Sequence, residues 1–235
     1  MIMIAFFLCS SLTFVKEEDP VTTADFMKTT KPLLDADELL DLQTEFMHRW
    51  DKGSPAEDPM LSSPTEGQSP DSELKTHMLA NHGHNFRLWQ LEDRVRCRDS
   101  PDHEIVDLKR QIDRENQLRH DAVESFDEVL LGLLQNLHRN TSTYHELPTF
   151  SETPGAILDR TSIINLKLFH LEKRADDPLQ TAATRSLSAR NSANLAIQLR
   201  DLGTCLREII SALERGERRL SIYYQFKMYQ NPPPR

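Results

Sequence analysis

The chain has 235 residues and a net charge of −9 at pH 7. This acidic balance argues against a general nucleic-acid-binding protein, which would be basic. Its length suits one domain of about 150 residues with extensions. Glycine is scarce, with 7 residues, and Leu, Glu, Arg, Asp and Gln fill long stretches. These features predict an all-α fold, a bundle of about five helices.

Three cysteines, Cys9, Cys97 and Cys205, lie far apart without a CxxC pair. This spacing argues against a zinc site and against a disulfide framework. It fits a reduced, cytoplasmic protein, and we predict no metal and no cofactor.

Residues 1–31 form an apolar segment followed by a polar linker. The run Met1–Val15 is strongly apolar but too short for a helix of about 20 residues, so we expect no stable membrane span. It has the length of a signal-peptide core, although no Lys or Arg precedes it. The alternative to a cytoplasmic location is export through an atypical N-terminal signal. If the segment is not a signal, it is a loosely packed apolar arm or the result of a misassigned start.

A first helix is expected over residues 32–50, with an apolar stripe that includes Leu39, Phe46 and Trp50. Residues 51–72 are rich in Pro and Ser and read as a disordered linker. The remaining helical domain spans residues 73–232.

The second helix is expected over 73–98. Gly83 weakens a helix interior by roughly 1 kcal/mol relative to Ala, so a break or kink is expected there. His82 and His84 stand two positions apart and do not share a helix face, which makes them a weak metal signal.

The third helix, expected over 101–140, carries a polar gap in its apolar stripe at Asn116, Arg119 and His120. Such a gap indicates either a wet cavity or a buried hydrogen-bonded network, because an unpaired buried group costs about 1 to 3 kcal/mol. Further along, Glu124 and Asp127 share a face, but a single ExxD pattern is too common to predict a metal site.

The stretch 151–170 reads as a capped helix. Ser151 or Thr153 can be the N-cap and Pro154 suits the first turn. Asp159 and Asn165, interleaved with apolar residues, are the expected partners of the polar gap in the third helix.

A fifth helix is expected over 179–216. The segment that follows, 217–229, is aromatic and basic and includes Tyr223 and Tyr224. Such a segment either covers a core or offers a surface to an unknown protein partner.

Four motifs occur in order: FRLWQLEDRVR, LKRQIDRENQLRHDAVESFD, ETPGAILDRTSIINLKLFH and YYQFKMYQNP. Together they resemble the uncharacterised bacterial family catalogued as domain of unknown function 4254, over residues 73–232. The resemblance implies no established activity. Its members often occur in gene neighbourhoods for cell-envelope sugar assembly, which is only an association.

Two functional hypotheses follow. The favoured one is a non-catalytic interaction or scaffold protein, whose buried polar layer fixes helix register and which can form an oligomer. The alternative is an enzyme or small-molecule-binding protein that acts on a phosphorylated or nucleotide-sugar ligand, with arginines gripping the anion. The ligand-binding candidates are Glu92, Arg94, Asp113, Asn116, Arg119, Asp159 and Asn165.

Overall fold

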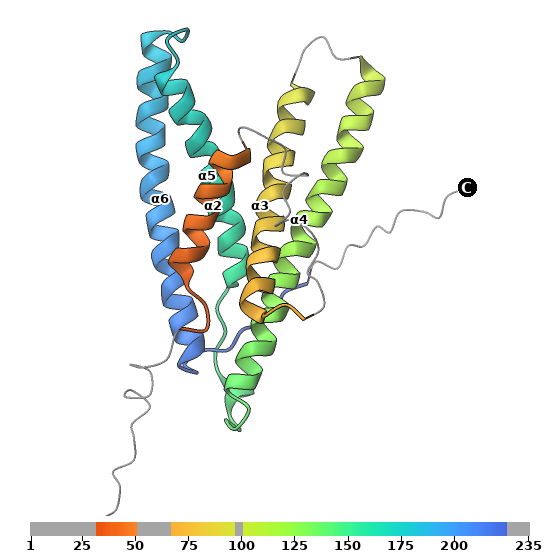
Figure 1. Ribbon diagram of the computed structural model, residues 1–235, viewed down its shortest axis with the longest axis vertical. Coiled ribbons are helices and arrows are strands. Elements are labelled where there is room, and N and C mark those ends of the chain that lie inside the picture. Colours follow the sequence, from red (N-terminus) through yellow and green to blue (C-terminus); the bar gives the residue numbers. More distant parts are fainter. Residues whose placement is uncertain (1–31, 51–66, 97–100, 225–235) are drawn as a thin grey trace, which may run out of the picture. The chain divides into compact units, whose positions relative to one another are not determined.

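The computed structural model describes residues 32–50, 67–96 and 101–224 (Figure 1). These residues form five α-helices and one 3-10 helix, and they contain no β-strand. In chain order the elements are α2 (Ala36–Trp50), α3 (Pro70–Val95), α4 (Asp102–Leu137), η3 (Tyr144–Glu146), α5 (Pro154–Asp176) and α6 (Ala182–Glu214). The predicted all-α fold is confirmed.

The helix starts follow from local capping chemistry. Thr153, one of the two predicted N-caps of α5, accepts a hydrogen bond from the Ala156 backbone N–H at 3.1 Å. Helix α3 begins at Pro70, inside the range assigned to the linker. There the Ser69 hydroxyl accepts from the Ser72 N–H, and the fixed φ of proline suits the first helical position.

The expected break at Gly83 is wrong, because α3 runs as one helix from Pro70 to Val95. The residues around the glycine explain the continuity: Leu79, His82 and Phe86 are all buried. A buried Leu or Phe contributes about 1.5 to 3 kcal/mol, which outweighs the roughly 1 kcal/mol that a helical glycine costs.

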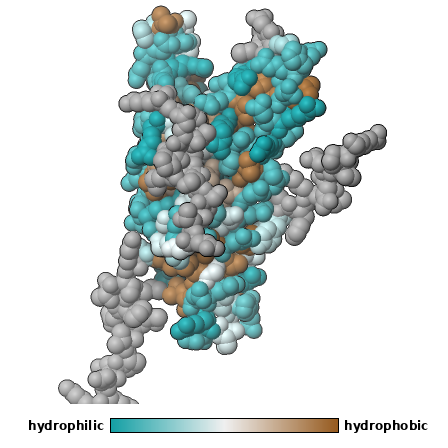
Figure 2. Space-filling view, turned by 45° about the vertical axis from the view of Figure 1, so that its right-hand side comes forward, coloured by the Kyte–Doolittle hydropathy of each residue, from teal (hydrophilic) through white to brown (hydrophobic). Residues whose placement is uncertain are grey.

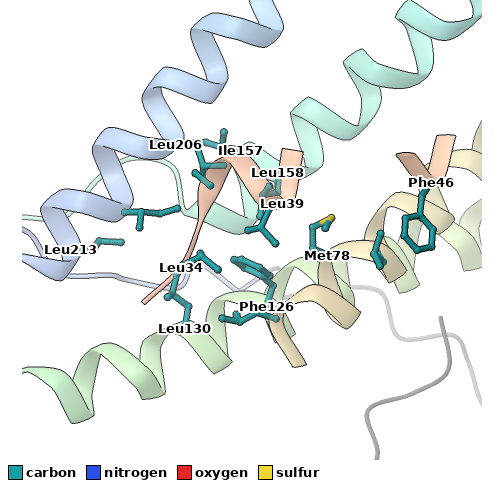
Figure 3. Packing of buried hydrophobic residues seen from close by; sticks show 14 of the residues in the cluster. Leu34, Leu39, Phe46, Met78, Phe126, Leu130, Ile157, Leu158, Leu206 and Leu213 are labelled. Carbon is teal, nitrogen blue, oxygen red and sulfur yellow. The ribbon is translucent and has the colours of Figure 1, made fainter. Parts of the chain in front are cut away.

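The core forms where α2 packs between two helical hairpins. Helix α3 packs most extensively on α4, and α5 on α6, while α2 contacts α3, α5 and α6. Figure 3 shows side chains from all five helices converging there. Fully or almost fully buried members are Leu39 and Phe46 from α2, Met78 from α3, Phe126 and Leu130 from α4, Ile157 and Leu158 from α5, and Leu206 and Leu213 from α6.

A smaller apolar cluster joins α3 to α4 away from this core, through Leu88, Leu91, Leu108 and Ile112. On the face shown in Figure 2 hydrophilic residues dominate, and hydrophobic residues form separate patches. None of the helices within the described ranges combines the length and apolar character that a membrane crossing requires.

The segment after α6 is held against α4 and the loop before α5. Leu220 is buried, and the Arg219 N–H donates to the Pro148 carbonyl at 3.1 Å. The Tyr224 hydroxyl donates to Glu128 Oε1 at 3.0 Å. The predictions for residues 1–31, for most of the linker and for the aromatic segment beyond Tyr224 concern positions outside the described residues.

Candidate functional site

Two pockets lie side by side along α5, the first beside α4 and the second beside α3 and α4. The α5 residues of the first pocket are Ala156, Asp159 and Arg160, and those of the second are Ile163, Leu166 and Lys167. These positions recur every three or four residues, so they share one face of the helix. The two pockets are therefore successive parts of one groove.

We call the first one the Asp127 pocket, which has a volume of about 320 Å³. Its lining includes carboxylates, hydroxyls and a histidine. Ile222 and Tyr223, which follow α6, also line it. Its lining residues are His120, Val123, Glu124, Asp127, Ser151, Glu152, Thr153, Ala156, Asp159, Arg160, Ile222 and Tyr223.

The second is the Arg119 pocket, which has a volume of about 400 Å³. Three cationic residues, two carboxylates and two amides line it together with apolar side chains. Its lining residues are Asn85, Leu88, Trp89, Glu92, Asp93, Arg96, Asn116, Arg119, Ile163, Leu166 and Lys167.

Asp159 and Arg119 face each other at the boundary between the pockets. Asn81 Nδ2 donates to Asp159 Oδ1 at 2.8 Å, and Asn85 Nδ2 donates to the same oxygen at 2.9 Å. Behind them Asn85 also donates to Ser162 Oγ at 3.0 Å, and Ser162 Oγ lies 2.7 Å from His82 Nδ1. Helices α3 and α5 thus hold the Asp159 carboxylate in one orientation.

The Arg119 guanidinium is satisfied only in part, through Nη2, which lies 3.2 Å from His120 Nε2. Its Nε is buried and lies 3.7 Å from Asp159 Oδ1, beyond hydrogen-bond distance. Trp89 Nε1, in the same pocket, is also buried and has no acceptor among the residues that the structure describes. The Trp89 ring stacks on His170 with a centroid distance of 4.4 Å. The Arg119 pocket therefore carries two buried N–H donors without hydrogen bonds.

Asp127 is the most perturbed carboxyl at the groove. It is only 2% exposed and its Oδ1 accepts the Gly155 backbone N–H at 2.9 Å, at the start of α5. Burial raises the pKa of Asp127 to about 6, while hydrogen bonds from Thr153 and Gly155 oppose the shift and the charge of Glu124 adds to it. Asp127 can therefore exchange a proton near neutral pH.

A separate buried network ties α2 to α5 without touching either pocket. Gln43 Nε2 donates to the Leu158 carbonyl at 2.9 Å, and Gln43 Oε1 accepts from Thr161 Oγ1 at 2.9 Å and from Asn165 Nδ2 at 3.2 Å. Every polar atom named here has a partner, so this network fixes the register of two helices.

A third polar cluster lies between α3 and α4. His84 Nδ1 lies 2.7 Å from Glu115 Oε2, and Arg87 Nε donates to the same oxygen at 2.9 Å. Burial lowers the pKa of His84, although its contact with Glu115 opposes that shift. For Glu115, burial acts to raise the pKa, but the hydrogen bonds from His84 and Arg87 outweigh it and leave the pKa lowered. The cluster joins the two helices through hydrogen bonds and charge.

The structure brings together four of the seven predicted site residues. Glu92, Asn116 and Arg119 line the Arg119 pocket, and Asp159 stands at its boundary. Asn165 is buried as expected, but its partner is Gln43 rather than the polar gap of α4.

The other two candidates lie elsewhere. Arg94 is exposed and pairs with Glu104 at 3.2 Å. Asp113 is exposed and pairs with Lys109 at 3.0 Å. Both belong to solvated faces of their helices, where charged side chains are normally found.

The sequence prediction missed several residues of the networks and the pocket, among them Gln43, Asn81, His82, Asn85 and Trp89. A signal was present for two of them, because Gln43 lies four residues after Leu39 and His82 lies four residues after Met78. Each therefore continues an apolar stripe at helical spacing, which predicts burial. The described residues hold no group of three His, Cys, Asp or Glu side chains placed to bind a metal ion.

The described residues form an all-α protein with a groove along α5 that α3 and α4 also line. The family described as protein of unknown function (DUF4254) matches residues 75–222, and the chain belongs to this family. No curated protein matches the chain. No solved structure matches it either.

Proposed function

We propose that the protein binds a small anionic molecule in the Arg119 pocket. The observation that supports this most strongly is the pair of buried N–H donors, Arg119 Nε and Trp89 Nε1, that lack hydrogen bonds. Each buried donor left without a partner costs about 1 to 3 kcal/mol. A ligand with acceptor oxygens, such as a phosphate group, would remove that cost once the two side chains turn toward the pocket, since solvent does not reach either nitrogen in this conformation.

The charge and size of the pocket suit such a ligand. Arg119, Arg96 and Lys167 line it, against the two carboxylates Glu92 and Asp93, and an arginine fork matches the oxygens of a phosphate. Arg96 is tied only loosely to Glu92 and Asp93, at 4.0 and 3.6 Å. A volume of about 400 Å³ lies within the usual range for small-molecule sites.

The scaffold hypothesis accounts for only part of this arrangement. It explains the network of Gln43, Thr161 and Asn165, which is internally satisfied and locks two helices together. It gives no reason for unsatisfied donors in the wall of a pocket, because a purely structural layer gains stability by satisfying every buried group. Binding explains both features, since the satisfied network makes the pocket rigid.

Isothermal titration of the wild-type protein with inorganic phosphate, with acetate as the carboxylate alternative, tests the proposal. Arg119→Ala should weaken phosphate binding about tenfold or more, as expected for the loss of a hydrogen bond to a charged group. Arg114→Ala is the matched control, because Arg114 is an exposed arginine on the same helix. Equal affinity in the two variants, or no binding by the wild-type protein, would contradict the proposal.

A further inference from the structure

We propose that His82, Ser162 and Asn85 form a positioning relay, which holds Asp159 beyond hydrogen-bond distance of Arg119 Nε, at 3.7 Å, and so keeps Arg119 able to bind an anion. The inference rests on the proposed function. It assigns a role in ligand affinity to side chains that lie behind the pocket wall, two of which line neither pocket.

The relay is continuous and buried from end to end. His82 and Ser162 are 0% exposed and Asn85 is 4% exposed. The Trp50 ring stacks on the His82 imidazole at a centroid distance of 5.1 Å, which fixes the plane of the imidazole at the far end. Asn85 links the relay to the Asp159 carboxylate at the near end.

The proposed relay assigns a direction to each of its hydrogen bonds. Ser162 Oγ has two partners in the described part of the chain, and it accepts from Asn85 Nδ2. A hydroxyl oxygen can accept twice, so the contact with His82 fits either direction; the relay assigns the Ser162 proton to His82 Nδ1 and the imidazole proton to Nε2, which is buried and has no hydrogen-bond partner among the described residues.

A neutral His82 fits this arrangement. Burial lowers the pKa of His82 to about 3, and the Gln43 backbone carbonyl opposes the shift. The ring is therefore uncharged at neutral and mildly acidic pH. A neutral imidazole can accept from Ser162, whereas a charged one would have to donate and would turn the hydroxyl around.

The effect of the relay on the pocket comes through Asp159 Oδ1. Two amide donors, from Asn81 and Asn85, hold this oxygen at 2.8 and 2.9 Å, while Arg119 Nε stays 3.7 Å away. If Asn85 loses its contact with Ser162, its amide can turn and release the carboxylate. Asp159 can then accept a hydrogen bond from Arg119, closing their present 3.7 Å ion pair, and compete with an incoming anion.

Two variants separate positioning from mere stability. Ser162→Ala removes the relay, while Thr161→Val removes the neighbouring buried hydroxyl, which bonds Gln43 and not Asp159. Thermal unfolding should show a similar loss of stability in both. Inorganic phosphate should bind about tenfold more weakly to Ser162→Ala, as for a lost hydrogen bond that acts on a charged group, and with unchanged affinity to Thr161→Val.

The His82 ring gives a second readout that needs no variant. Nitrogen NMR of the wild-type imidazole should show the neutral form with its proton on Nε2, at neutral and mildly acidic pH. A proton on Nδ1, or a charged ring, overturns the relay.

The outcomes also separate the two proposals. No phosphate binding by the wild-type protein overturns the proposed function and this inference with it. Phosphate binding that is equal in Ser162→Ala and Thr161→Val overturns the relay alone.

Discussion

The buried carboxyl of Asp127 should make the stability of this protein depend on pH, and Asp127→Asn should remove that dependence. Burial raises the pKa of Asp127 from 3.8 to about 6 in the folded protein. One pKa unit corresponds to about 1.4 kcal/mol. The rise from 3.8 to about 6 therefore means that ionising Asp127 costs about 3 kcal/mol more in the folded protein than in the unfolded chain.

The direction of the pH effect follows from which state binds the proton more tightly. The folded protein does, because its Asp127 pKa lies above the value of 3.8 for an unfolded chain. The stabilising contribution of this proton is therefore fully present below pH 3.8 and is lost as the pH rises through about 6.

Urea denaturation of the wild type and Asp127→Asn, from about pH 4 to about pH 8, measures the effect. The amide oxygen of asparagine can still accept the Gly155 N–H that now bonds Asp127 Oδ1. The free energy of unfolding of the variant, minus that of the wild type, should rise by up to about 3 kcal/mol across this range.

Asp113→Asn is the matched control, since Asp113 is an exposed carboxylate on the same helix. Its difference from the wild type should change little with pH. If the Asp127→Asn difference is equally flat, or falls as the pH rises, burial does not dominate the environment of Asp127.

Three further substitutions test the packing and the networks. Gly155→Ala should lower the free energy of unfolding by about 1 to 3 kcal/mol in urea denaturation, because the new Cβ would lie 2.9 Å from the Asp127 carboxyl. Gly132→Ala, which meets nothing within 4 Å, should be neutral or stabilising; equal effects of the two would rule out the steric argument. Gln43→Ala should lower the free energy of unfolding by about 2 to 4 kcal/mol, and with it the melting temperature, because it leaves Thr161 and Asn165 with fewer hydrogen-bond partners. An unchanged melting temperature would show that the network adds nothing to stability. Trp89→Phe should leave the free energy of unfolding unchanged or raise it by about 1 kcal/mol, since it removes a buried donor without an acceptor. The same change should weaken phosphate binding. A clear loss of stability would mean that the indole N–H is satisfied.

Much of the fold could be predicted because apolar spacing and capping residues act locally. The stripe through Leu39, Phe46 and Trp50 marks the buried face of α2, and Thr153 with Pro154 marks the start of α5. Local spacing could not predict that α3 continues through Gly83. The burial that outweighs the glycine cost involves partners on other helices, which local spacing does not reveal.

The candidate site was predicted in part for the same reason. The polar gap in the apolar stripe of α4 indicated Arg119, and Asp159 was its expected partner, now 3.7 Å away. Asn165 could not be assigned to its partner, because the choice between Gln43 and α4 depends on how α5 is rotated. Arg94 and Asp113 had the right chemistry for a site but lie on solvated faces.

The central claim is that an anion binds beside Arg119, and the two tryptophans of the chain allow a direct measurement. Trp89 lines the Arg119 pocket, whereas Trp50 is buried in the core against Phe46. In a titration with inorganic phosphate followed by proton–nitrogen NMR, the indole N–H signal of Trp89 should shift and saturate while that of Trp50 stays in place. The shift should disappear in Arg119→Ala. A Trp89 signal that does not move, or that moves equally in Arg119→Ala, would contradict the claim.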